Sequence, residues 1–491
     1  MNLREQFFDR AVTESFDVAI IGGGATGLGA AVDAASRGLK TILLEQSDFA
    51  KGTSSRSTKL IHGGVRYLKQ GNVSLVRESL HERGLLLQNA PGLVRPLEFI
   101  IPTFSMWERL FYATGLKMYD ALSGRRGMAR SRMLSTPEVC RRVPTIQAAK
   151  LNGGVSYFDA QFDDARLAIA MTTLLKELQG IPLNYVRAVN LLKLQGKVVG
   201  LVGEDVETGR QFEIGARSVI NATGIFTDEI RQIDDPGTRP MLKVSRGSHL
   251  VVDRSFLPGE TAIIIPSTDD GRVVFIIPWH GKTVIGTTDI PATEPVLDLF
   301  PLEGEIQFLL DHASRYLNRP VGRGEVHSTF CGLRPLVSTS AEKSTSKISR
   351  DHVLKVSQSE LITITGGKWT TYRKMAQDTI DAAVSTAGLT ARPSMTTELS
   401  LTGNSHDHPQ EPQTAESVTE DFLRRSVHQE QARTIDDVLS RRCRLLLLDA
   451  RAAIEVAPRT AAFLAQELGK TESWEASQIH DFTRFAEKHL P

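Results

Sequence analysis

Three glycines near the N-terminus have the spacing of a nucleotide-binding turn. Gly22, Gly24 and Gly27 follow an apolar run at residues 18–21 and open an Ala-rich stretch at residues 25–37. In a G-x-G-x-x-G turn the first glycine permits the tight bend, the second lets the backbone approach a pyrophosphate, and the third lets helix and strand pack closely. The N-terminus of the following helix would present free N–H groups to the phosphates. The spacing predicts dinucleotide binding, against the alternative of a purely structural turn.

The position of Glu45 strengthens this prediction. Glu45 ends a second apolar run, residues 41–44, and its carboxylate is suited to accept hydrogen bonds from a ribose diol. Gly38 stands where the intervening helix must stop. A glycine turn between a strand and a helix, followed by an acidic strand end, is more specific than the glycines alone, but it does not separate NAD from FAD.

A hydroxyl-rich loop follows directly. Residues 53–68 read TSSRSTKLIHGGVRYL, dense in Ser, Thr and Gly and then basic and aromatic. A loop in this place can supply hydroxyl and backbone donors to a cofactor, and the alternative is an ordinary polar loop. On composition alone, the two interpretations stay open.

Charge and cysteine content exclude several classes of protein. The chain has 491 residues, with 58 Lys and Arg against 57 Asp and Glu, so no charge imbalance points to nucleic acid. Its three cysteines, Cys140, Cys331 and Cys443, lie far apart in the sequence. They cannot form a four-Cys iron–sulfur or zinc site, and we expect no metal. They also provide no disulfide framework, which favours a reducing, cytoplasmic location.

The sequence shows no membrane-spanning segment. The N-terminal 16 residues are charged throughout and lack the apolar core of a signal peptide. No apolar run approaches the roughly 18 residues that a transmembrane helix needs. We therefore expect that any contact with the cell membrane is peripheral, on its inner face.

Residues 72–150 are predicted to be mainly helical, and one helical face in this segment is apolar. The residues that share this face, at spacings of three and four, are Trp107, Leu110, Phe111, Thr114, Met118 and Leu122. The basic residues that follow include Arg125, Arg126, Arg130 and Arg132. One interpretation is a core-facing helix and a solvated loop. The other is an amphipathic, basic surface for anionic lipid headgroups.

The remaining chain alternates between patterns. Residues 155–235 show alternating β and α patterns and end in a small-residue turn at Thr223 and Gly224. Short β-branched runs at residues 241–337 predict an antiparallel sheet. A second glycine turn then opens a helix at residues 366–384, where Gly367, Lys368 and Thr370 could meet an anionic cofactor edge. A Ser-, Thr- and Pro-rich stretch and a helical C-terminal region follow.

These blocks together resemble the FAD-dependent glycerol-3-phosphate dehydrogenase family, in its aerobic, respiratory type. The matching blocks are IIGGGATGLGAAVDAASRG, TSSRSTKLIHGGVRYL, FDDARL, VINATG, RGSHLVV, FIIPW, IGTTD, CGLRPL, SRDH and GGKWTTYRK. They span nearly all of residues 16–376, and the stretch ARTIDDVLSRRCR resembles that family's C-terminal region. Several blocks are specific to the family rather than to Rossmann folds in general.

The resemblance implies an α/β fold. It combines an FAD-binding, Rossmann-like domain of the glutathione-reductase or D-amino-acid-oxidase type with an inserted antiparallel-sheet substrate domain and a C-terminal helical domain. The expected segments are 15–90, 155–235 and 346–385 for the FAD domain, 91–154 for a mainly helical part of unassigned membership, 236–345 for the substrate (cap) domain, 386–418 for a linker and 419–491 for the C-terminal domain.

The implied reaction is oxidation of sn-glycerol 3-phosphate to dihydroxyacetone phosphate, by hydride transfer to FAD, with electrons passed to a quinone. This chemistry needs a hydride acceptor, a base for the hydroxyl proton and cations for the phosphate. Arginine suits phosphate because its planar guanidinium makes permanent, two-pronged contacts. The cations within matching blocks are Arg66, Arg334, Arg350 and Lys368. Tyr67 and His249 also resemble lining of the substrate pocket.

The catalytic base is left open among three residues. Histidine is the usual choice near neutral pH, which favours His62 or His249. The family pattern also allows Arg334 close to the reacting carbon. The residues expected to hold FAD are Gly22, Gly24, Gly27, Glu45, Thr53, Ser54, Ser57, His62, Gly63, Gly64, Thr223, Gly224, Gly367, Lys368 and Thr370.

Two other functions compete with this one. An oxidase that reduces oxygen to peroxide, or an amine-oxidising relative, would share the fold. The alternative outside enzymes is a flavin-containing binding protein that has lost turnover, and retention of all four cations argues against it. A homodimer is the hypothesis for the oligomeric state.

Overall fold

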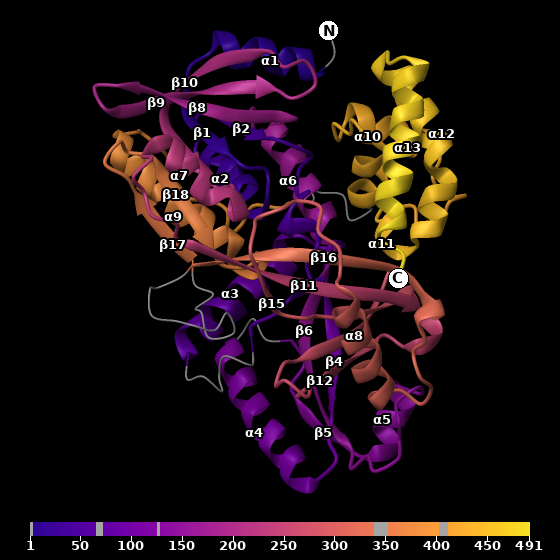
Figure 1. The fold of residues 1–491 in the computed structure, drawn as a ribbon. Helices are drawn as coiled ribbons and strands as arrows, with labels where there is room; N and C mark the ends of the chain where they lie inside the picture. Colours follow the sequence, from indigo (N-terminus) through magenta and orange to yellow (C-terminus); the bar gives the residue numbers. More distant parts are fainter. Residues whose placement is uncertain (1–2, 65–71, 125–127, 338–351, 402–410) are drawn as a thin grey trace.

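The computed structural model describes residues 3–64, 72–124, 128–337, 352–401 and 411–491 (Figure 1). In the view of Figure 1, a sheet that contains β1 and β2 lies in the upper part and a second sheet in the lower part. The C-terminal helices, in yellow, stand beside the first sheet. The two sheets and the helical bundle agree with the mixed α/β fold that the sequence predicted.

The first sheet has eight strands within the described residues, in the order β17-β18-β10-β1-β2-β7, with β8 and β9 joined through β10. The strands are β1 (Phe16–Ile21), β2 (Thr41–Glu45), β7 (Ile181–Asn184), β8 (Val186–Leu194), β9 (Lys197–Asp205), β10 (Gln211–Asn221), β17 (His352–Val356) and β18 (Ile362–Gly366). Strand β1 runs parallel to β2 and β10. Both faces of β1 are covered, because Val18 and Ile20 belong to one apolar cluster and Ala19 and Ile21 to another. Burial on both faces explains the continuous apolar run.

Helices cover both faces of this sheet. Helices α2 (Ala25–Ser36), α6 (Asp164–Glu177) and α9 (Tyr372–Ala387) pack on one face, and α1 (Leu3–Thr13) on the other. The predicted unit at residues 16–45 is therefore confirmed as strand, turn, helix and strand. Gly38 follows α2 with φ +85°, a backbone conformation that suits the glycine expected there.

The second sheet has ten strands in the described part of the chain. They are β3 (Leu60–Ile61), β4 (Val94–Pro102), β5 (Arg132–Leu134), β6 (Gly154–Phe162), β11 (Leu242–Asp253), β12 (Thr261–Ile265), β13 (Val274–Trp279), β14 (Lys282–Gly286), β15 (Ile290–Ala292) and β16 (Val326–Val337). The antiparallel pairing expected at residues 241–337 is confirmed, with β11 between β14 and β16. One face packs on α5 (Thr136–Arg142) and α8 (Glu303–Tyr316), and the other on α3 (Val73–Asn89) and α4 (Met106–Ser123).

The prediction for residues 91–154 needs correction. This segment contains α4 and α5, but also β4 and β5, so it is not mainly helical. Strand β6, which we assigned to the FAD domain, pairs with β4 in the second sheet instead. Pro96 and Pro102 lie in β4 and hide it from a pattern-based prediction, because proline is unfavourable in strand interiors. The other domain boundaries remain predictions.

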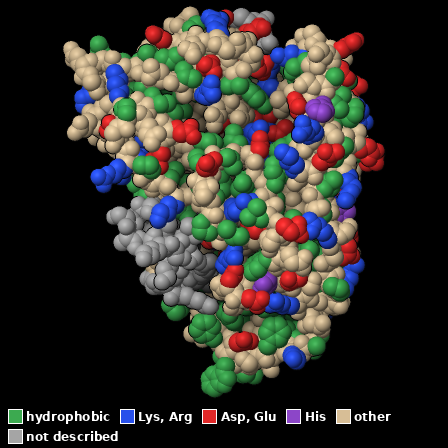
Figure 2. Space-filling model, viewed as in Figure 1, with side chains coloured by type: hydrophobic (Ala, Val, Ile, Leu, Met, Phe, Trp, Pro, Cys, Tyr) green, Lys and Arg blue, Asp and Glu red, His purple; other side chains and the backbone are tan. Residues whose placement is uncertain are grey.

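Helix α4 turns its apolar face outward. Trp107 is 82% exposed and Phe111 60%, whereas the helix buries Ala113, Leu116 and Tyr119. The interpretation of this face as core-facing is therefore wrong. Hydrophobic side chains gather at the lower end of the molecule in Figure 2, where Figure 1 places α4.

The C-terminal region is helical, as predicted. Its α-helices are α10 (Glu420–His428), α11 (Leu445–Leu448), α12 (Ala450–Leu468) and α13 (Glu472–Glu487). A further helix, α7 (Thr227–Asp234), lies earlier in the chain, after β10. Buried arginines anchor this region: Arg441 and Arg442 donate to Asp48, and Arg444 Nη2 donates to Asp164 Oδ1 at 2.9 Å. We assigned no role to these arginines from the sequence, because their carboxylate partners lie hundreds of residues away.

Candidate functional site

The glycine turn connects β1 to α2 without room for side chains. Gly22 has φ +112°, and its N–H donates to the carbonyl of Leu44 at 2.8 Å. A Cβ on Gly22 would lie 2.6 Å from the Ala222 carbonyl oxygen, and one on Gly27 would lie 1.9 Å from the Gly22 carbonyl oxygen. Only glycine fits at these two positions, as the spacing of the motif implies.

Two partners surround the start of α2. Glu45 Oε2 accepts from the Gly23 N–H at 2.7 Å, and Ser54 Oγ accepts from the Ala25 N–H at 2.9 Å. Burial raises the pKa of Glu45, and the backbone N–H groups of Gly23 and Ser47 oppose this effect. Gly24 is the N-cap of the helix, and a Cβ there would lie 3.1 Å from Ser54 Oγ. The bare backbone and the helix N-terminus make a cradle that fits the pyrophosphate of FAD.

The neighbouring turn at the end of β10 borders this cradle. The Ala222 carbonyl packs so closely on Gly22 that no Cβ fits between them. The hydroxyl of Thr223 donates to Asn221 Oδ1 at 2.7 Å. Gly224 follows with φ +60°. The structure therefore brings together the two glycine-containing turns that the sequence assigned to the cofactor, since β1 and β10 are adjacent parallel strands.

The hydroxyl-rich loop links this turn to a large cavity. Its first part forms η1 (Thr53–Ser55), and Ser54 reaches α2 while Thr53 and Ser57 line the cavity. The carbonyl of Ser54 also accepts from the indole N–H of Trp369 at 2.9 Å. A dinucleotide that lies along this loop would extend from the glycine turn into the cavity.

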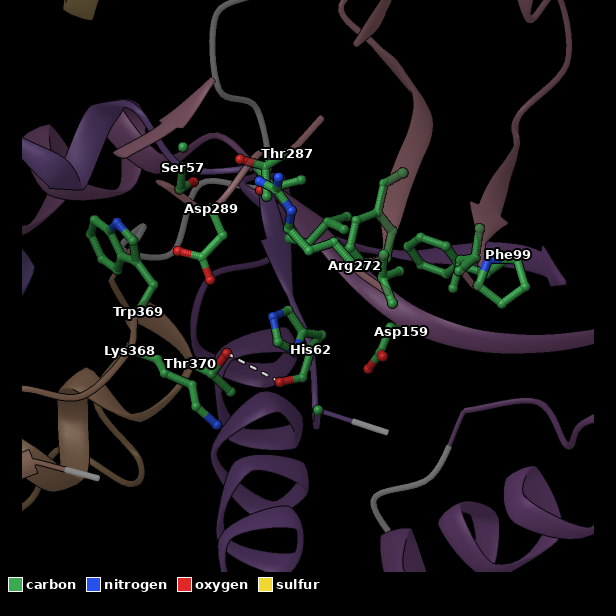
Figure 3. A pocket seen from close by; sticks show the side chains of 18 of the residues that line it. Ser57, His62, Phe99, Asp159, Arg272, Thr287, Asp289, Lys368, Trp369 and Thr370 are labelled. Carbon is green, nitrogen blue, oxygen red and sulfur yellow. Dashed lines mark hydrogen bonds between the residues drawn. The ribbon is translucent and has the colours of Figure 1, made fainter. Parts of the chain in front are cut away.

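The cavity has a volume of about 810 Å³ and gathers predicted residues from distant segments (Figure 3). Those that line it are Thr53, Ser57, His62, Gly64, His249, Arg334, Gly367, Lys368 and Thr370. In the view of Figure 3, Lys368 and Thr370 lie beside His62, and Asp289 lies above them. Arg66, Tyr67 and Arg350 lie outside the described residues, so their predicted roles remain predictions.

Arg334 on β16 is held in one orientation. Its Nη1 donates to the Arg246 carbonyl at 3.2 Å, and its Nη2 donates to Thr287 Oγ1 at 3.0 Å and to the Thr288 carbonyl at 3.1 Å. Asp289 Oδ1 lies 3.5 Å from Arg334 Nη1. A guanidinium that is fixed in this way is already oriented for an anionic ligand.

His249 on β11 is buried beside this arginine. Its ring stacks on Phe330 at 4.5 Å between centroids, and its Nε2 lies 3.0 Å from Thr58 Oγ1. Burial, and then the charges of Arg334 and Lys59, hold the pKa of His249 well below its usual value. The imidazole is therefore neutral at neutral pH, with one ring nitrogen unprotonated.

Several cavity residues were missed in the sequence. Thr58, Thr287 and Asp289 line the cavity, as does Asp159 of β6. Thr287 and Asp289 stand in the IGTTD block, which we used only for the resemblance. Their partner Arg334 lies on another strand, and the pairing of β11 with β16 brings it near.

The cavity has a second, apolar end. Trp107, Leu110, Phe111 and Met118 of α4 line it, together with Phe99 and Phe275 of the second sheet. The outward-facing stripe of α4 is therefore continuous with the polar site that contains His249 and Arg334. A small phosphorylated substrate has too little apolar surface to pack against this apolar end.

Two family models match the chain. Residues 17–373 match the family described as FAD dependent oxidoreductase, and residues 357–475 match the C-terminal domain of alpha-glycerophosphate oxidase. Together they cover the glycine turn, both sheets and most of the C-terminal helices.

Whole-chain relatives agree with these matches. A mitochondrial glycerol-3-phosphate dehydrogenase of Mus musculus is 38% identical over 533 aligned residues, 96% of this chain and 73% of that protein. A mitochondrial glycerol-3-phosphate dehydrogenase of Arabidopsis thaliana is 43% identical over 390 residues, 77% of this chain and 62% of that protein.

A solved structure has the same architecture. It is the X-ray structure of a glycerol-3-phosphate dehydrogenase from Bacillus halodurans in complex with FAD, with a TM-score of 0.81 at 27% identity. The alignment covers 99% of this chain and 98% of that one.

Proposed function

Because the chain belongs to the FAD-dependent glycerol-3-phosphate dehydrogenase family, with FAD as its cofactor, we propose that it oxidises sn-glycerol 3-phosphate to dihydroxyacetone phosphate. The electrons then pass to a membrane quinone. The observation that carries the proposal is the cavity that combines a neutral, buried His249 with the fixed cation of Arg334. The turn at Gly22, Gly24 and Gly27 would hold FAD, which would supply the acceptor for the hydride from C2 of the substrate.

The positively charged side chains of the cavity would bind the phosphate of the substrate. Arg334 and Lys368 are lining residues from β16 and from the glycine turn after β18. Lys368 Nζ donates to Ser79 Oγ at 3.3 Å, which keeps the ammonium near the cavity wall. The predicted contacts of Arg66 and Arg350 would add to these two, with Tyr67 beside them.

His249 is the residue that we favour as the base. The arginine side chain remains protonated in proteins, so Arg334 cannot take the hydroxyl proton. Its role is to bind and orient the anionic substrate. His249 is neutral because of burial and of the neighbouring positive charges, and its Nε2 is held by the hydroxyl of Thr58. His62 lines the same cavity and is the second candidate.

Anaerobic mixing of the purified holoprotein with glycerol 3-phosphate tests this function. Bleaching of the flavin absorbance is expected, and a spectrum that stays oxidised would contradict the proposal. Under air, slow peroxide formation is expected, whereas peroxide release at the rate of substrate oxidation would identify an oxidase. Glycine in place of glycerol 3-phosphate tests the amine-oxidising alternative.

We propose that α4 provides quinone access and membrane contact. In the described part of the chain, no helix is both long and apolar enough to cross a bilayer. The stripe of Trp107, Leu110, Phe111 and Met118 is exposed, and the basic residues Arg130 and Arg132 are exposed nearby. Apolar side chains that are flanked by basic ones suit the headgroup region of an anionic membrane. The apolar end of the cavity would then open toward the layer in which quinone resides.

A further inference from the structure

One peptide unit at the edge of the cavity is fixed through both of its polar atoms. The carbonyl of His62 accepts from Thr370 Oγ1 at 3.3 Å, as the dashed line in Figure 3 shows. The N–H of Gly63, in the same peptide unit, donates to the hydroxyl of Tyr119 at 2.9 Å and to Asp159 Oδ1 at 3.2 Å. Three segments that are remote in sequence therefore determine the plane of this peptide.

Asp159 organises the partners of Gly63. The Tyr119 hydroxyl lies 2.8 and 2.9 Å from the two Asp159 oxygens, and Arg83 Nη1 donates to Asp159 Oδ1 at 2.6 Å. A hydroxyl has one hydrogen, so its donation to Asp159 leaves the oxygen lone pairs for the Gly63 N–H. Asp159 thus sets the direction of the hydrogen bond between Tyr119 and Gly63.

The whole cluster is buried. Asp159, Tyr119 and Arg83 are each 1% exposed. Burial raises the pKa of Asp159, and the Arg83 guanidinium opposes this effect. Burial of a paired charge is unfavourable unless hydrogen bonds satisfy it, and here Arg83 and the Tyr119 hydroxyl both donate to Asp159, which accepts from the Gly63 N–H as well.

Close packing surrounds Gly63. A Cβ on Gly63 would lie 2.4 Å from Leu80 Cδ2 and 2.4 Å from the Tyr119 hydroxyl. The Tyr119 hydroxyl therefore occupies the space that a side chain at position 63 would fill. His62 is the neighbour of this glycine, and its ring lies in the cavity (Figure 3).

We propose that Asp159 and Tyr119 are positioning residues, which fix the His62–Gly63 peptide and so direct the His62 ring into the cavity. The functional consequence rests on the proposed oxidation of glycerol 3-phosphate. The placement of His62 itself does not, because the contacts are present in the chain whatever its substrate. Misplacement of a cavity group by about 1 Å can lower a rate by about 100-fold.

The direct test follows the His62 ring by NMR in FAD-loaded protein labelled with ¹³C-histidine. The His62 signal is identified by its absence in a His62→Gln variant. Tyr119→Phe removes the hydroxyl and keeps the ring, so the His62 signal should shift while that of the remote His312 stays in place. An unchanged His62 signal in both Tyr119→Phe and Asp159→Asn would overturn the proposal.

A matched control separates positioning from simple stability. Glu82 is the neighbour of Arg83 on α3, and it accepts from Arg373 of α9 at 2.7 and 2.8 Å. Glu82 is 2% exposed, so Glu82→Gln breaks an equally buried ion pair on the same helix. Glu82→Gln should lower the melting temperature and leave the His62 signal unmoved. A shift as large as that of Tyr119→Phe would show that the cluster has only a structural role.

Stopped-flow reduction of the flavin by glycerol 3-phosphate gives the functional readout. Tyr119→Phe is expected to lower the rate constant at saturating substrate about 10- to 100-fold, with little change in the half-saturating concentration. A wild-type flavin that is not reduced would refute the proposed function and leave the NMR test valid. A wild-type flavin that is reduced no faster than that of Tyr119→Phe would show that the position of His62 does not limit flavin reduction, and would refute the functional consequence of the proposal.

Discussion

Helices α2 and α4 are both rich in apolar residues, yet they have opposite surroundings. Ten residues of the 12-residue α2 are buried, whereas α4 buries only three of its 18, counting described residues. Helix α2 lies between the first sheet and its covering helices, so its small side chains meet protein on nearly every side. Helix α4 rests on the second sheet by one narrow face. Apolar spacing thus identifies a helix, but not the face that meets the protein.

The comparison also separates two kinds of binding surface. The turn before α2 would bind the cofactor through its backbone, which is accessible because the glycines have no side chains. A single added Cβ would therefore disrupt cofactor binding. The outer face of α4 uses exposed side chains, and each contributes a small part of a larger surface. The effects of substitution should therefore range from loss of the cofactor to small changes in partitioning.

The largest effect is expected from Gly27→Ala. Its Cβ would lie 1.9 Å from the Gly22 carbonyl oxygen, so the turn must shift and the pyrophosphate cradle is lost. We expect nearly all of the bound flavin to be lost at fixed FAD, because the shifted backbone can no longer approach the pyrophosphate. Flavin released by acid precipitation measures it. The matched change in α4 is Gly115→Ala, whose Cβ meets no described atom within 4 Å and should leave the flavin content unchanged.

The second effect concerns the fixed cation of the polar end. Arg334→Ala removes a partly buried charge-assisted contact, and we expect it to weaken substrate binding by roughly 2–5 kcal/mol. The KM for glycerol 3-phosphate should rise far more than the flavin content falls. Arg315→Ala, on the exposed side of α8, is the control. Equal KM values in the two variants would place the phosphate elsewhere.

A smaller effect is expected at the outer face of α4. Replacement of Arg130 and Arg132 by Ser should weaken binding to anionic vesicles by about 1 kcal/mol for each residue, and added salt should reduce the difference. Trp107→Ser should weaken binding at all salt concentrations, and activity with a soluble dye should persist. Leu194→Ser on the β8–β9 hairpin is the control, since Leu194 is 65% exposed. Equal pelleting of all variants would exclude α4 as the membrane contact.

The last prediction is a pH shift. The pKa of His249 lies below the usual histidine value of 6.5, so the imidazole stays neutral at pH values below 6.5. The acid limb of the kcat/KM profile should therefore lie below pH 6.5. Arg334 contributes to this lowering, so the pKa of His249 should rise in Arg334→Ala. The acid limb should then move to higher pH. A limb that stays in place would assign the titration to another group, such as His62.

The sequence was sufficient for the cofactor turn because its requirements are local. Gly22, Gly27 and Glu45 lie within one strand–helix–strand unit. Inside this unit Gly22 donates to the Leu44 carbonyl, Gly27 packs on Gly22, and Glu45 accepts from the Gly23 N–H. The cavity depends instead on strand pairing between distant segments. Residues 242–253 meet 326–337 in register, which places His249 opposite Phe330 and Arg334 near Thr288. Without a resemblance to a known family, no spacing rule would have joined these residues.

The C-terminal arginines show the same limit more strongly. Asp48 and Arg441 are separated by 393 positions, and Asp164 and Arg444 by 280. A short motif with three basic residues around position 443 is typical of a solvent-exposed helix. Only the folded chain shows that its members are among the most deeply buried side chains.

These arginines have a consequence for the order in which the protein matures. As the chain leaves the ribosome, the loop that carries Asp48 and the helix that begins with Asp164 emerge long before Arg441, Arg442 and Arg444. Until then both carboxylates lack cations that they have in the native state, and burial of an unpaired charge is strongly unfavourable. The hydroxyl-rich loop that follows Asp48 can therefore reach its native packing only when nearly all of the chain has been synthesised. Flavin incorporation belongs after translation, and fragments that end before residue 441 should remain colourless.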